Sequence, residues 1–161
     1  DAFLAELLPK INAETATEPE ISQYFMVLGF DRGATTKRGR STGYLDLQWL
    51  RYAIRINGPR WLAFGGIDKY SRLKRIPVVT GYKLDGRMLG PREMPLTREL
   101  YRVEPVVNYL PGWSEDITGA RSEDELPNNA RGLVSWLKTE LGVPVLLLGT
   151  GPKHDDLIVL A

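Results

Sequence analysis

The chain has 161 residues, of which 43% are hydrophobic and 25% are charged, so it can form the core of one globular domain and is not disordered as a whole. Its formal net charge of +1 lacks the basic excess that is typical of proteins that bind nucleic acids or membrane surfaces. With no cysteine and a single histidine, His154, the sequence excludes disulfides, thiolate metal sites and clusters of histidine ligands.

The first third of the chain is predicted to hold a short helix, a strand and a long loop. Residues 1–23 are polar and contain two prolines, which indicates a short helix followed by loop. Residues 24–30 form a short apolar run that predicts a buried strand, and residues 31–43 contain almost no apolar side chain and predict a loop. No stretch approaches the roughly 20 apolar residues that span a bilayer, and no signal peptide begins the sequence, so we expect a soluble, cytoplasmic protein that contacts no membrane.

The middle of the chain alternates between helix and strand signals. Apolar residues recur at helical spacing from residue 45 to 56, with Asp46 near the start and Asn57-Gly58 as a left-handed C-terminal cap. Residues 61–64 predict a buried strand, and residues 76–84 predict another that turns at Asp85-Gly86, a dipeptide favoured in tight hairpins. Residues 103–110 are a further candidate strand.

The last third has the clearest pattern. A helix is predicted to begin with Pro127 in its first turn and to run to Leu141, where Gly142 ends it. Residues 143–148 are continuously apolar, as in a strand covered on both faces, and residues 157–160 predict a neighbouring strand. Helix, strand, glycine loop and strand together indicate an α/β fold, in which ligands bind at strand ends.

The loop of residues 31–44 carries the first candidate site. Its three glycines let the backbone approach a ligand, and its hydroxyls and arginines suit an anionic small molecule. A solvated basic loop and an RNA-binding arm are the alternatives, and the second lacks aromatic residues that would stack on bases. The polar side chains in question are Thr35, Thr36, Lys37, Arg38, Arg40, Ser41 and Thr42.

Two strand ends carry a second candidate site, within segments 64–69 and 148–153. Asp68 follows the strand at 61–64, and its carboxylate can accept hydrogen bonds from N1 and N2 of guanine; a tight turn with an exposed aspartate is the alternative. The loop Gly149-Thr150-Gly151-Pro152 has amides that could face a base or phosphate, and a plain turn explains it equally well.

The remaining conspicuous side chains are predicted to be structural. Trp49 and Trp136 fall on amphipathic helices and Trp61 in a strand, so all three are expected in the core, whereas Trp113 lies in a turn and core packing explains it less well. His154, between two charged residues, is expected to be solvated.

Taken in order, these segments resemble the C-terminal half of adenylosuccinate synthetase, and the resemblance covers almost the whole chain. Residues 33–46 are similar to the family's Gly-Ala-Thr-Thr-Gly-Arg-x-Arg-Arg-x-Gly-Trp stretch. Each of the other matches is weak alone, but their order and spacing are specific. They are residues 1–7, 50–53, 57–58, 82–86, 103–106, 110–113, 126–130, 141–144 and 149–152.

The resemblance implies a ligase that joins L-aspartate to C6 of IMP with GTP and Mg²⁺, after phosphorylation of the purine O6. It implies the C-terminal part of that fold: a mixed sheet with flanking helices and a base-binding region like that of P-loop NTPases. Arg38 would also reach the nucleotide monophosphate, and Arg40 would offset charge on the moving phosphoryl group. The residues implied in aspartate and substrate binding are Ala34, Thr35, Thr36, Lys37, Arg38, Gly39 and Arg40. Those implied in nucleotide binding are Arg38, Arg40, Gly66, Asp68, Gly149, Thr150 and Gly151.

The sequence departs from the family at several positions. Gly66 stands where the family has the lysine of Thr-Lys-x-Asp, whose stem covers the base, and Lys37 replaces a glycine. A divergent phage branch of the family, which takes dGMP and ATP or dATP, is therefore the alternative to IMP and GTP.

The sequence also lacks the family's glycine-rich phosphate loop and the catalytic Asp and His of its N-terminal half. We therefore expect no catalytic residue in residues 1–161 beyond Arg40, no metal ligands, and no turnover by this polypeptide alone. A non-catalytic nucleotide-binding remnant is a further alternative. The family resemblance implies a homodimer that does not bind nucleic acid.

Overall fold

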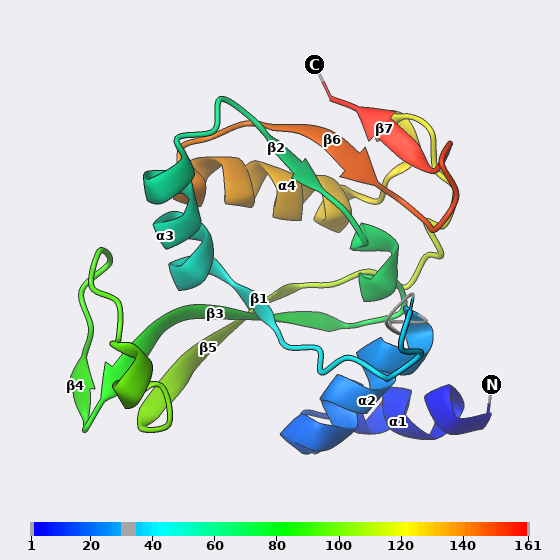
Figure 1. The fold of residues 1–161 in the computed structure, drawn as a ribbon. Coiled ribbons are helices and arrows are strands. Elements are labelled where there is room, and N and C mark those ends of the chain that lie inside the picture. The colour runs from blue at the N-terminus through cyan, green and yellow to red at the C-terminus, as the bar shows by residue number, and fades with distance from the viewer. Residues whose placement is uncertain (1, 30–34, 161) are drawn as a thin grey trace.

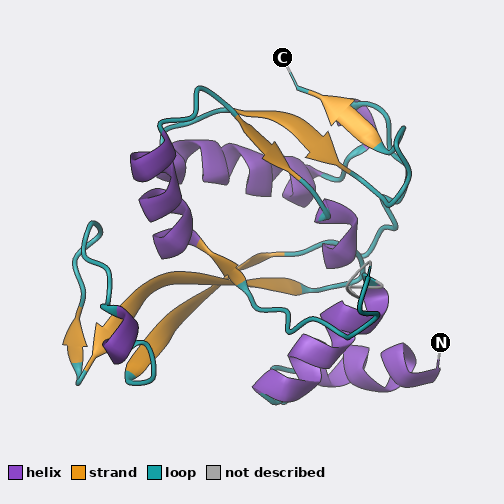
Figure 2. Cartoon of the chain, viewed as in Figure 1, coloured by secondary structure: helices purple, strands orange, loops and turns teal. Residues whose placement is uncertain are grey.

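The computed structural model describes residues 2–29 and 35–160, which build two sheets and their flanking helices (Figures 1 and 2). One layer contains a long hairpin with a pair of helices at its side, and the other contains a small sheet lying on a helix. This confirms the predicted α/β class with a mixed sheet, since parallel and antiparallel pairs occur in both sheets.

The N-terminal helical pair is α1 (Ala2–Asn12) and α2 (Glu18–Leu28). The prediction of a strand at residues 24–30 is wrong, because α2 runs through residue 28; residue 30 lies outside the described residues. The Glu20 carboxylate accepts hydrogen bonds from the backbone N–H of Thr17 at 2.7 Å and from its hydroxyl at 2.9 Å, which starts the helix. Tyr24 and Phe25 are then buried from helical positions against Leu7.

The larger sheet is built around one long hairpin. Strands β3 (Arg75–Leu84) and β5 (Val103–Pro111) pair antiparallel, the short β4 (Arg87–Met88) pairs antiparallel with β3, and β1 (Leu45–Asp46) pairs parallel with it. The predicted turn is confirmed, because Asp85 and Gly86 join β3 to β4 with φ of 52° and 81°. A short 3₁₀ helix, η2 (Thr97–Glu99), precedes β5.

Helix α3 (Leu47–Asn57) leads out of the large sheet. It begins two residues later than predicted, because residues 45–46 pair with β3 and the Asp46 carboxylate accepts the Trp49 N–H at 2.9 Å as an N-terminal cap. Its predicted left-handed end is confirmed by Gly58, whose φ is 56°.

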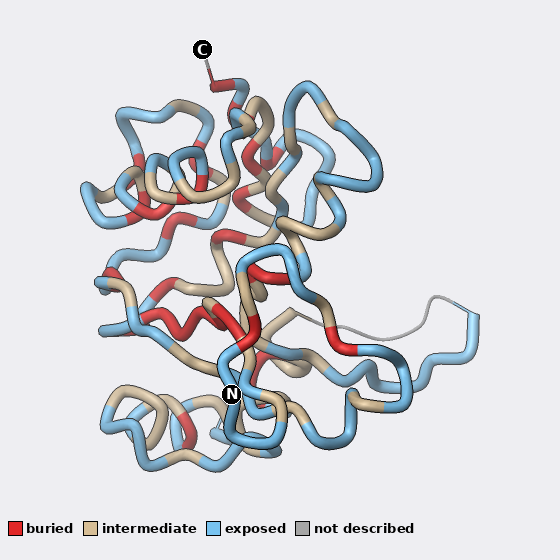
Figure 3. The backbone as a smooth tube through the Cα atoms, turned by 90° about the vertical axis from the view of Figure 1, so that its left-hand side faces the viewer, coloured by how far each residue is buried: buried red, intermediate tan, exposed pale blue. Residues whose placement is uncertain are grey.

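The small sheet lies on helix α4 (Asn128–Leu141) in the order β2 (Leu62–Phe64), β6 (Val145–Gly149), β7 (Leu157–Val159). The short 3₁₀ helix η1 (Ile67–Tyr70) follows β2, and the short 3₁₀ helix η3 (Glu123–Glu125) directly precedes α4. Leu133, Leu148 and Ile158 are almost fully buried in the core cluster that the helix and the sheet share. Figure 3 colours buried parts of the backbone red, and these alternate with exposed parts along the chain. The prediction that residues 143–148 are covered on both faces is wrong, because Leu146 and Leu147 are only half-buried.

The burial of the tryptophans differs from the prediction at two of the three positions predicted to lie in the core. Trp49 and Trp61 are 40% and 48% exposed, so core packing is wrong for both, whereas Trp136 packs against the core as predicted. Trp113 is only 4% exposed and contacts the ring of Tyr70 edge-on, with ring centroids 6.4 Å apart. His154 is exposed, as expected. In the part of the chain that the structure describes, no helix combines the length and apolar character that a membrane crossing requires.

Candidate functional site

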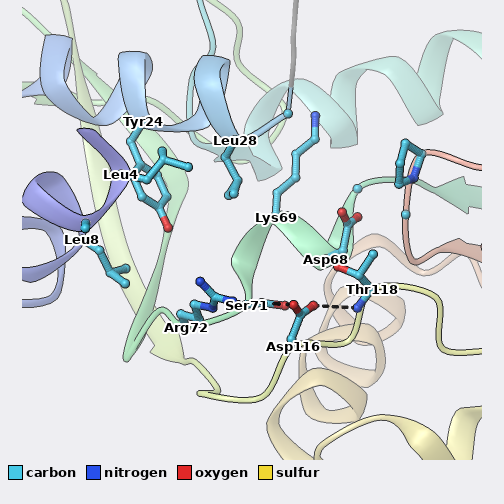
Figure 4. A pocket seen from close by; sticks show the side chains of 15 residues that line it. Leu4, Leu8, Tyr24, Leu28, Asp68, Lys69, Ser71, Arg72, Asp116 and Thr118 are labelled. Atoms are coloured by element: carbon cyan, nitrogen blue, oxygen red, sulfur yellow. Dashed lines mark hydrogen bonds and ion pairs between the residues drawn. The ribbon is translucent and has the colours of Figure 1, made fainter. Parts of the chain in front are cut away.

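The largest cavity near the predicted base-binding residues has a volume of about 710 Å³ and lies where β2 and β6 end. Gly66, Asp68 and Gly151 all line it, although Asp68 and Gly151 lie far apart in the sequence. β2 and β6 are parallel, so their carboxyl ends meet at one edge of the small sheet. The structure therefore brings the two predicted base-binding segments together (Figure 4).

Glycines allow the two strand ends to touch. A Cβ at Gly149 would lie 3.1 Å from Cα of Gly65, which is closer than side chains normally approach a backbone. The N–H of Gly66 donates to the carbonyl of Gly149 at 3.1 Å, and Gly66 has a φ of 77°, a left-handed value that favours glycine. Gly149 thus joins the strands, while Gly66 and Gly151 border the cavity.

The Asp68 carboxylate is the group in this cavity best suited to read a base. Desolvation by burial raises its pKa, and the neighbouring carboxylates Asp116 and Asp156 act in the same direction. A hydrogen bond from its own backbone N–H and the charge of Lys69 oppose this shift. Among the described residues no other side chain donates a hydrogen bond to the carboxylate, so lone pairs remain available to a ligand in the cavity.

Buried Asp156 holds the glycine loop after β6 in place. Its side chain is 3% exposed, it forms an ion pair with Arg121 at 2.8 Å, and it accepts the backbone N–H of Lys153 at 2.9 Å. These contacts lower its pKa, with the Lys153 hydrogen bond first. A Cβ on Gly151 would lie 2.9 Å from Cγ of Asp156, so the loop closes around this carboxylate only with glycine at position 151.

Thr150 supports the loop from inside the protein. It is fully buried, its hydroxyl donates to the carbonyl of Ala120 at 2.8 Å, and its N–H donates to the carbonyl of Asp156 at 2.9 Å. Its carbonyl accepts the N–H of Gly119 at 3.1 Å. All of its polar groups therefore have protein partners, and it acts on the cavity through the neighbouring glycines.

The predicted anion-binding loop lies apart from the large cavity. Residues 35–41 are exposed, and none of the predicted side chains from Thr35 to Arg40 lines that cavity; Ala34 lies outside the described residues. The loop is tied to α2 where Thr42 donates its hydroxyl to the carbonyl of Ser22 at 2.7 Å. Gly43 follows this anchor and lines a second cavity of about 150 Å³, which Gly66 also borders.

Lys69 connects the two cavities, and sequence reasoning missed it. It lines both of them, and its stem would lie 3.5 Å from a Cβ at Gly66. Its ammonium extends toward Gly29 and away from Asp68 (Figure 4). Lys69 could have been predicted as a site residue from its position directly after Asp68, the residue expected to bind the base.

Further residues on the floor of the large cavity were also missed. Arg72 and Asp116 form an ion pair at 3.7 Å, and the N–H of Thr118 donates to Asp116 at 2.9 Å. Leucines of α1 and α2, among them Leu4 and Leu28, form an apolar wall opposite these groups (Figure 4). No motif marked these side chains, because they come together only through packing of the helical pair against η1.

Comparison with known proteins decides the family. A model of the adenylosuccinate synthetase family matches residues 10–158. The chain belongs to the adenylosuccinate synthetase family. The enzyme of Acidothermus cellulolyticus is 44% identical over 135 residues, and that of Mycobacterium tuberculosis is 43% identical over 141 residues. These matches cover 83% and 87% of this chain.

A solved relative has the same fold. The structure of fully ligated adenylosuccinate synthetase from Plasmodium falciparum matches with a TM-score of 0.83 and 31% identity, over 88% of this chain. The chain spans only 31% of the Acidothermus enzyme, 32% of the Mycobacterium enzyme and 34% of the Plasmodium chain. The family predicted from the sequence is thus confirmed, for a chain about one third as long as its relatives.

Proposed function

We propose that this chain is the aspartate- and base-binding part of an adenylosuccinate synthetase, a ligase that joins L-aspartate to C6 of IMP. The reaction consumes GTP and passes through a 6-phosphoryl intermediate in purine nucleotide biosynthesis. The observation that supports this most directly is the meeting of Gly66, Asp68 and Gly151 around one cavity, in a chain of this family.

Asp68 gives the proposed site a preference for guanine over adenine. An ionised carboxylate accepts two hydrogen bonds from N1–H and the N2 amine of guanine. Adenine presents an acceptor at N1, which would face the carboxylate without a proton between them. A guanine donor therefore gains two charge-assisted hydrogen bonds, about 1.5–3 kcal/mol each, that an adenine donor lacks.

The exposed loop is proposed to bind the second substrate. Thr35, Thr36 and Arg38 would hold the carboxylates of aspartate, because hydroxyls and a guanidinium fork match carboxylate oxygens. Arg38 would also reach the monophosphate, and Arg40 would stabilise charge on the phosphoryl group as it moves. The hydrogen bond from the Thr42 hydroxyl to the Ser22 carbonyl of α2 fixes the C-terminal end of this loop.

The remaining parts of the reaction are proposed to come from outside this chain. The described residues contain no group of three or more His, Cys, Asp or Glu side chains that could hold a metal ion, so they do not fit Mg²⁺ and no step is assigned to it here. The phosphate loop, the metal ligands and the catalytic acid and base would come from a complementary part of the enzyme. We further propose a cytoplasmic homodimer.

The test is an assay of the intact gene product with aspartate, IMP or dGMP, and GTP or ATP, with detection of the succinyl-nucleotide. Product from IMP and GTP is expected. Product from dGMP and ATP alone would instead support the phage-type reaction, and nucleotide binding without product in any combination would indicate a non-catalytic remnant.

Single variants then test the assigned residues. Asp68→Ala should raise KM for GTP by roughly 10²–10⁴-fold, since it removes both hydrogen bonds to the base, about 1.5–3 kcal/mol each. Asp155→Ala is the matched control, because Asp155 is exposed and does not line the cavity. Arg38→Leu should raise KM for aspartate; unchanged aspartate dependence would refute the role of the loop.

A further inference from the structure

The large cavity has a second end that base binding leaves unused. Its volume of about 710 Å³ lies in the range of small-molecule sites, whereas a purine held by Asp68 would occupy only the end where β2 and β6 stop. The other end lies between η1 and the helical pair, and in Figure 4 Tyr24, Leu4 and Leu8 line it on the side away from Asp68. We call it the helical end of the cavity.

Tyr24 brings an unpartnered hydroxyl to the helical end. The residue is only 2% exposed, yet its hydroxyl forms no hydrogen bond with any described residue. Burial raises the pKa of this hydroxyl and the charge of Arg72 opposes the shift, so the guanidinium lies within electrostatic reach of it. Because buried tyrosine hydroxyls normally have a hydrogen-bond partner, this one is suited to a polar group of a ligand in the cavity.

The backbone holds Arg72 at the border of the same cavity. Asn12 at the end of α1 donates from Nδ2 to the carbonyl of Arg72 at 3.1 Å, and its Oδ1 accepts the N–H of Lys74 at 2.8 Å. Between these two contacts Arg72 has a φ of 71°, a left-handed value that is uncommon for a residue other than glycine. Helix α1 thus fixes this turn, and the Arg72 side chain lines the cavity from a fixed point.

The guanidinium of Arg72 keeps its hydrogen-bonding capacity. Its pair with Asp116 measures 3.7 Å, which is longer than a hydrogen bond, and none of its side-chain N–H groups donates to a described residue. Five donors in a planar fork match the two oxygens of a carboxylate. Because Asp116 lies this close, the single cation favours a monoanion over a dianion such as phosphate.

Apolar side chains complete the helical end. Leu4 and Leu8 of α1 and Leu28 of α2 line it and are half-buried, so each still presents apolar surface to the cavity (Figure 4). They pack on the buried cluster that contains Tyr24, which fixes their positions. An apolar chain or ring that covers these leucines is stabilised in proportion to the apolar area removed from water.

We propose that the helical end of the cavity binds a monocarboxylate with an apolar body, whose carboxylate lies between Tyr24 and Arg72 and whose body covers the three leucines. The tyrosine hydroxyl and the guanidinium donate to the carboxylate oxygens, and the leucines make affinity depend on the length of the chain. This site goes beyond the proposed function, because none of these side chains is assigned to the nucleotide, to aspartate or to the reaction.

A titration of the intact gene product with straight-chain carboxylates tests the site, with octanoate as the main probe. Isothermal titration calorimetry should show saturation below about 10 mM, and Kd should fall roughly fourfold for each CH₂ between butanoate and octanoate. Two compounds serve as controls for the ligand. Acetate lacks the apolar body and should bind at least about 10-fold more weakly than octanoate, and 1-hexanol lacks the charge and should bind at least about 10-fold more weakly than hexanoate.

Two variants test the polar groups. Arg72→Leu should raise Kd for octanoate about 10–100-fold, since hydrogen bonds to a charged group are lost, and Tyr24→Phe should raise it about 2–10-fold. Arg98→Leu is the matched control for the charge and Tyr101→Phe for the hydroxyl, because both residues are exposed and do not line the cavity. Tyr24→Phe should change Tm by less than about 2 °C, because the hydroxyl has no partner among the described residues.

Saturable octanoate binding that the two cavity variants weaken and the two controls do not would support the proposal. No saturation below about 10 mM, equal effects of the cavity variants and their controls, or tighter binding of inorganic phosphate than of octanoate would overturn it. The titration uses neither nucleotide nor aspartate, so the two proposals can fail separately. Octanoate binding without ligase activity would contradict the proposed function alone, and ligase activity without octanoate binding would contradict this site alone.

Discussion

Replacing Gly151 by alanine tests how the glycine loop is built. The new Cβ would lie 2.9 Å from Cγ and 3.1 Å from Cβ of Asp156, a carboxylate fixed by Arg121 and by the Lys153 N–H. Because Asp156 is buried and held from two sides, it cannot swing away without loss of these contacts. Overpacking of this kind costs about 1–3 kcal/mol, which for a chain of this size lowers Tm by roughly 3–10 °C.

Thermal unfolding followed by circular dichroism measures this effect against a control with the opposite sign. Gly132 lies in α4, and a Cβ added there would have no atom within 4 Å, so Gly132→Ala should raise stability by about 0.5–1 kcal/mol. An Asp156→Ala background removes the contacts with the carboxylate and leaves only the 3.1 Å contact with Cβ, so Gly151→Ala should then cost about 1–2 kcal/mol less. An equal penalty with and without Asp156 would refute the clash as the cause.

Three further results are expected. Because burial raises the pKa of Asp68, GTP affinity should fall on acidification at a higher pH than an ordinary aspartate would give, and Asp68→Asn should remove this pH dependence in a titration by calorimetry. Gln48 is buried and donates to the carbonyls of residues 90 and 93 at 2.9 and 2.8 Å. Gln48→Leu removes both hydrogen bonds, although the carbonyl of residue 90 keeps the N–H of residue 93 as a partner, and should cost about 1–3 kcal/mol in denaturant unfolding, whereas Gln23→Leu at an exposed site should cost little. The hydrogen bonds from Thr17 and Lys10 lower the pKa of Glu20 to about 2. The ionised carboxylate therefore stabilises α2 fully above pH 4.5, and this stabilisation is lost as the pH falls toward 2. The helical circular dichroism signal of the protein should fall over this pH range, and it should fall less in the Glu20→Gln variant.

The one element of the wrong type shows which signal was overlooked. Residues 24–30 are apolar and short, and a run of this length fits a buried strand or part of a helix equally well. The deciding residues lie upstream, where Thr17 and Glu20 form a capping box and Pro19 sits in the first turn. The helix start could thus be read from the sequence, but the apolar run alone could not assign it.

Tryptophan burial was not predictable from its element, because burial depends on which side of that element is covered. Trp49 lies next to the capped start of α3 and contacts Tyr52 at its edge, so it stays 40% exposed. Trp113 follows β5 in an irregular segment, but its bridge to Ser71 draws it between the two layers. Contacts between distant segments decide both cases, and no local pattern contains them.

The two halves of the candidate site differ in the same way. Gly66, Asp68 and Gly151 could be predicted to meet, because each follows a strand of one sheet and parallel strands end at a common edge. The position of the Thr35–Arg40 loop depends instead on the tether between Thr42 and Ser22, a residue of α2. The sequence predicted residue 22 to lie in a loop, which would provide no rigid anchor for Thr42. The chemistry of the Thr35–Arg40 loop could therefore be predicted, but its position relative to the base-binding cavity could not.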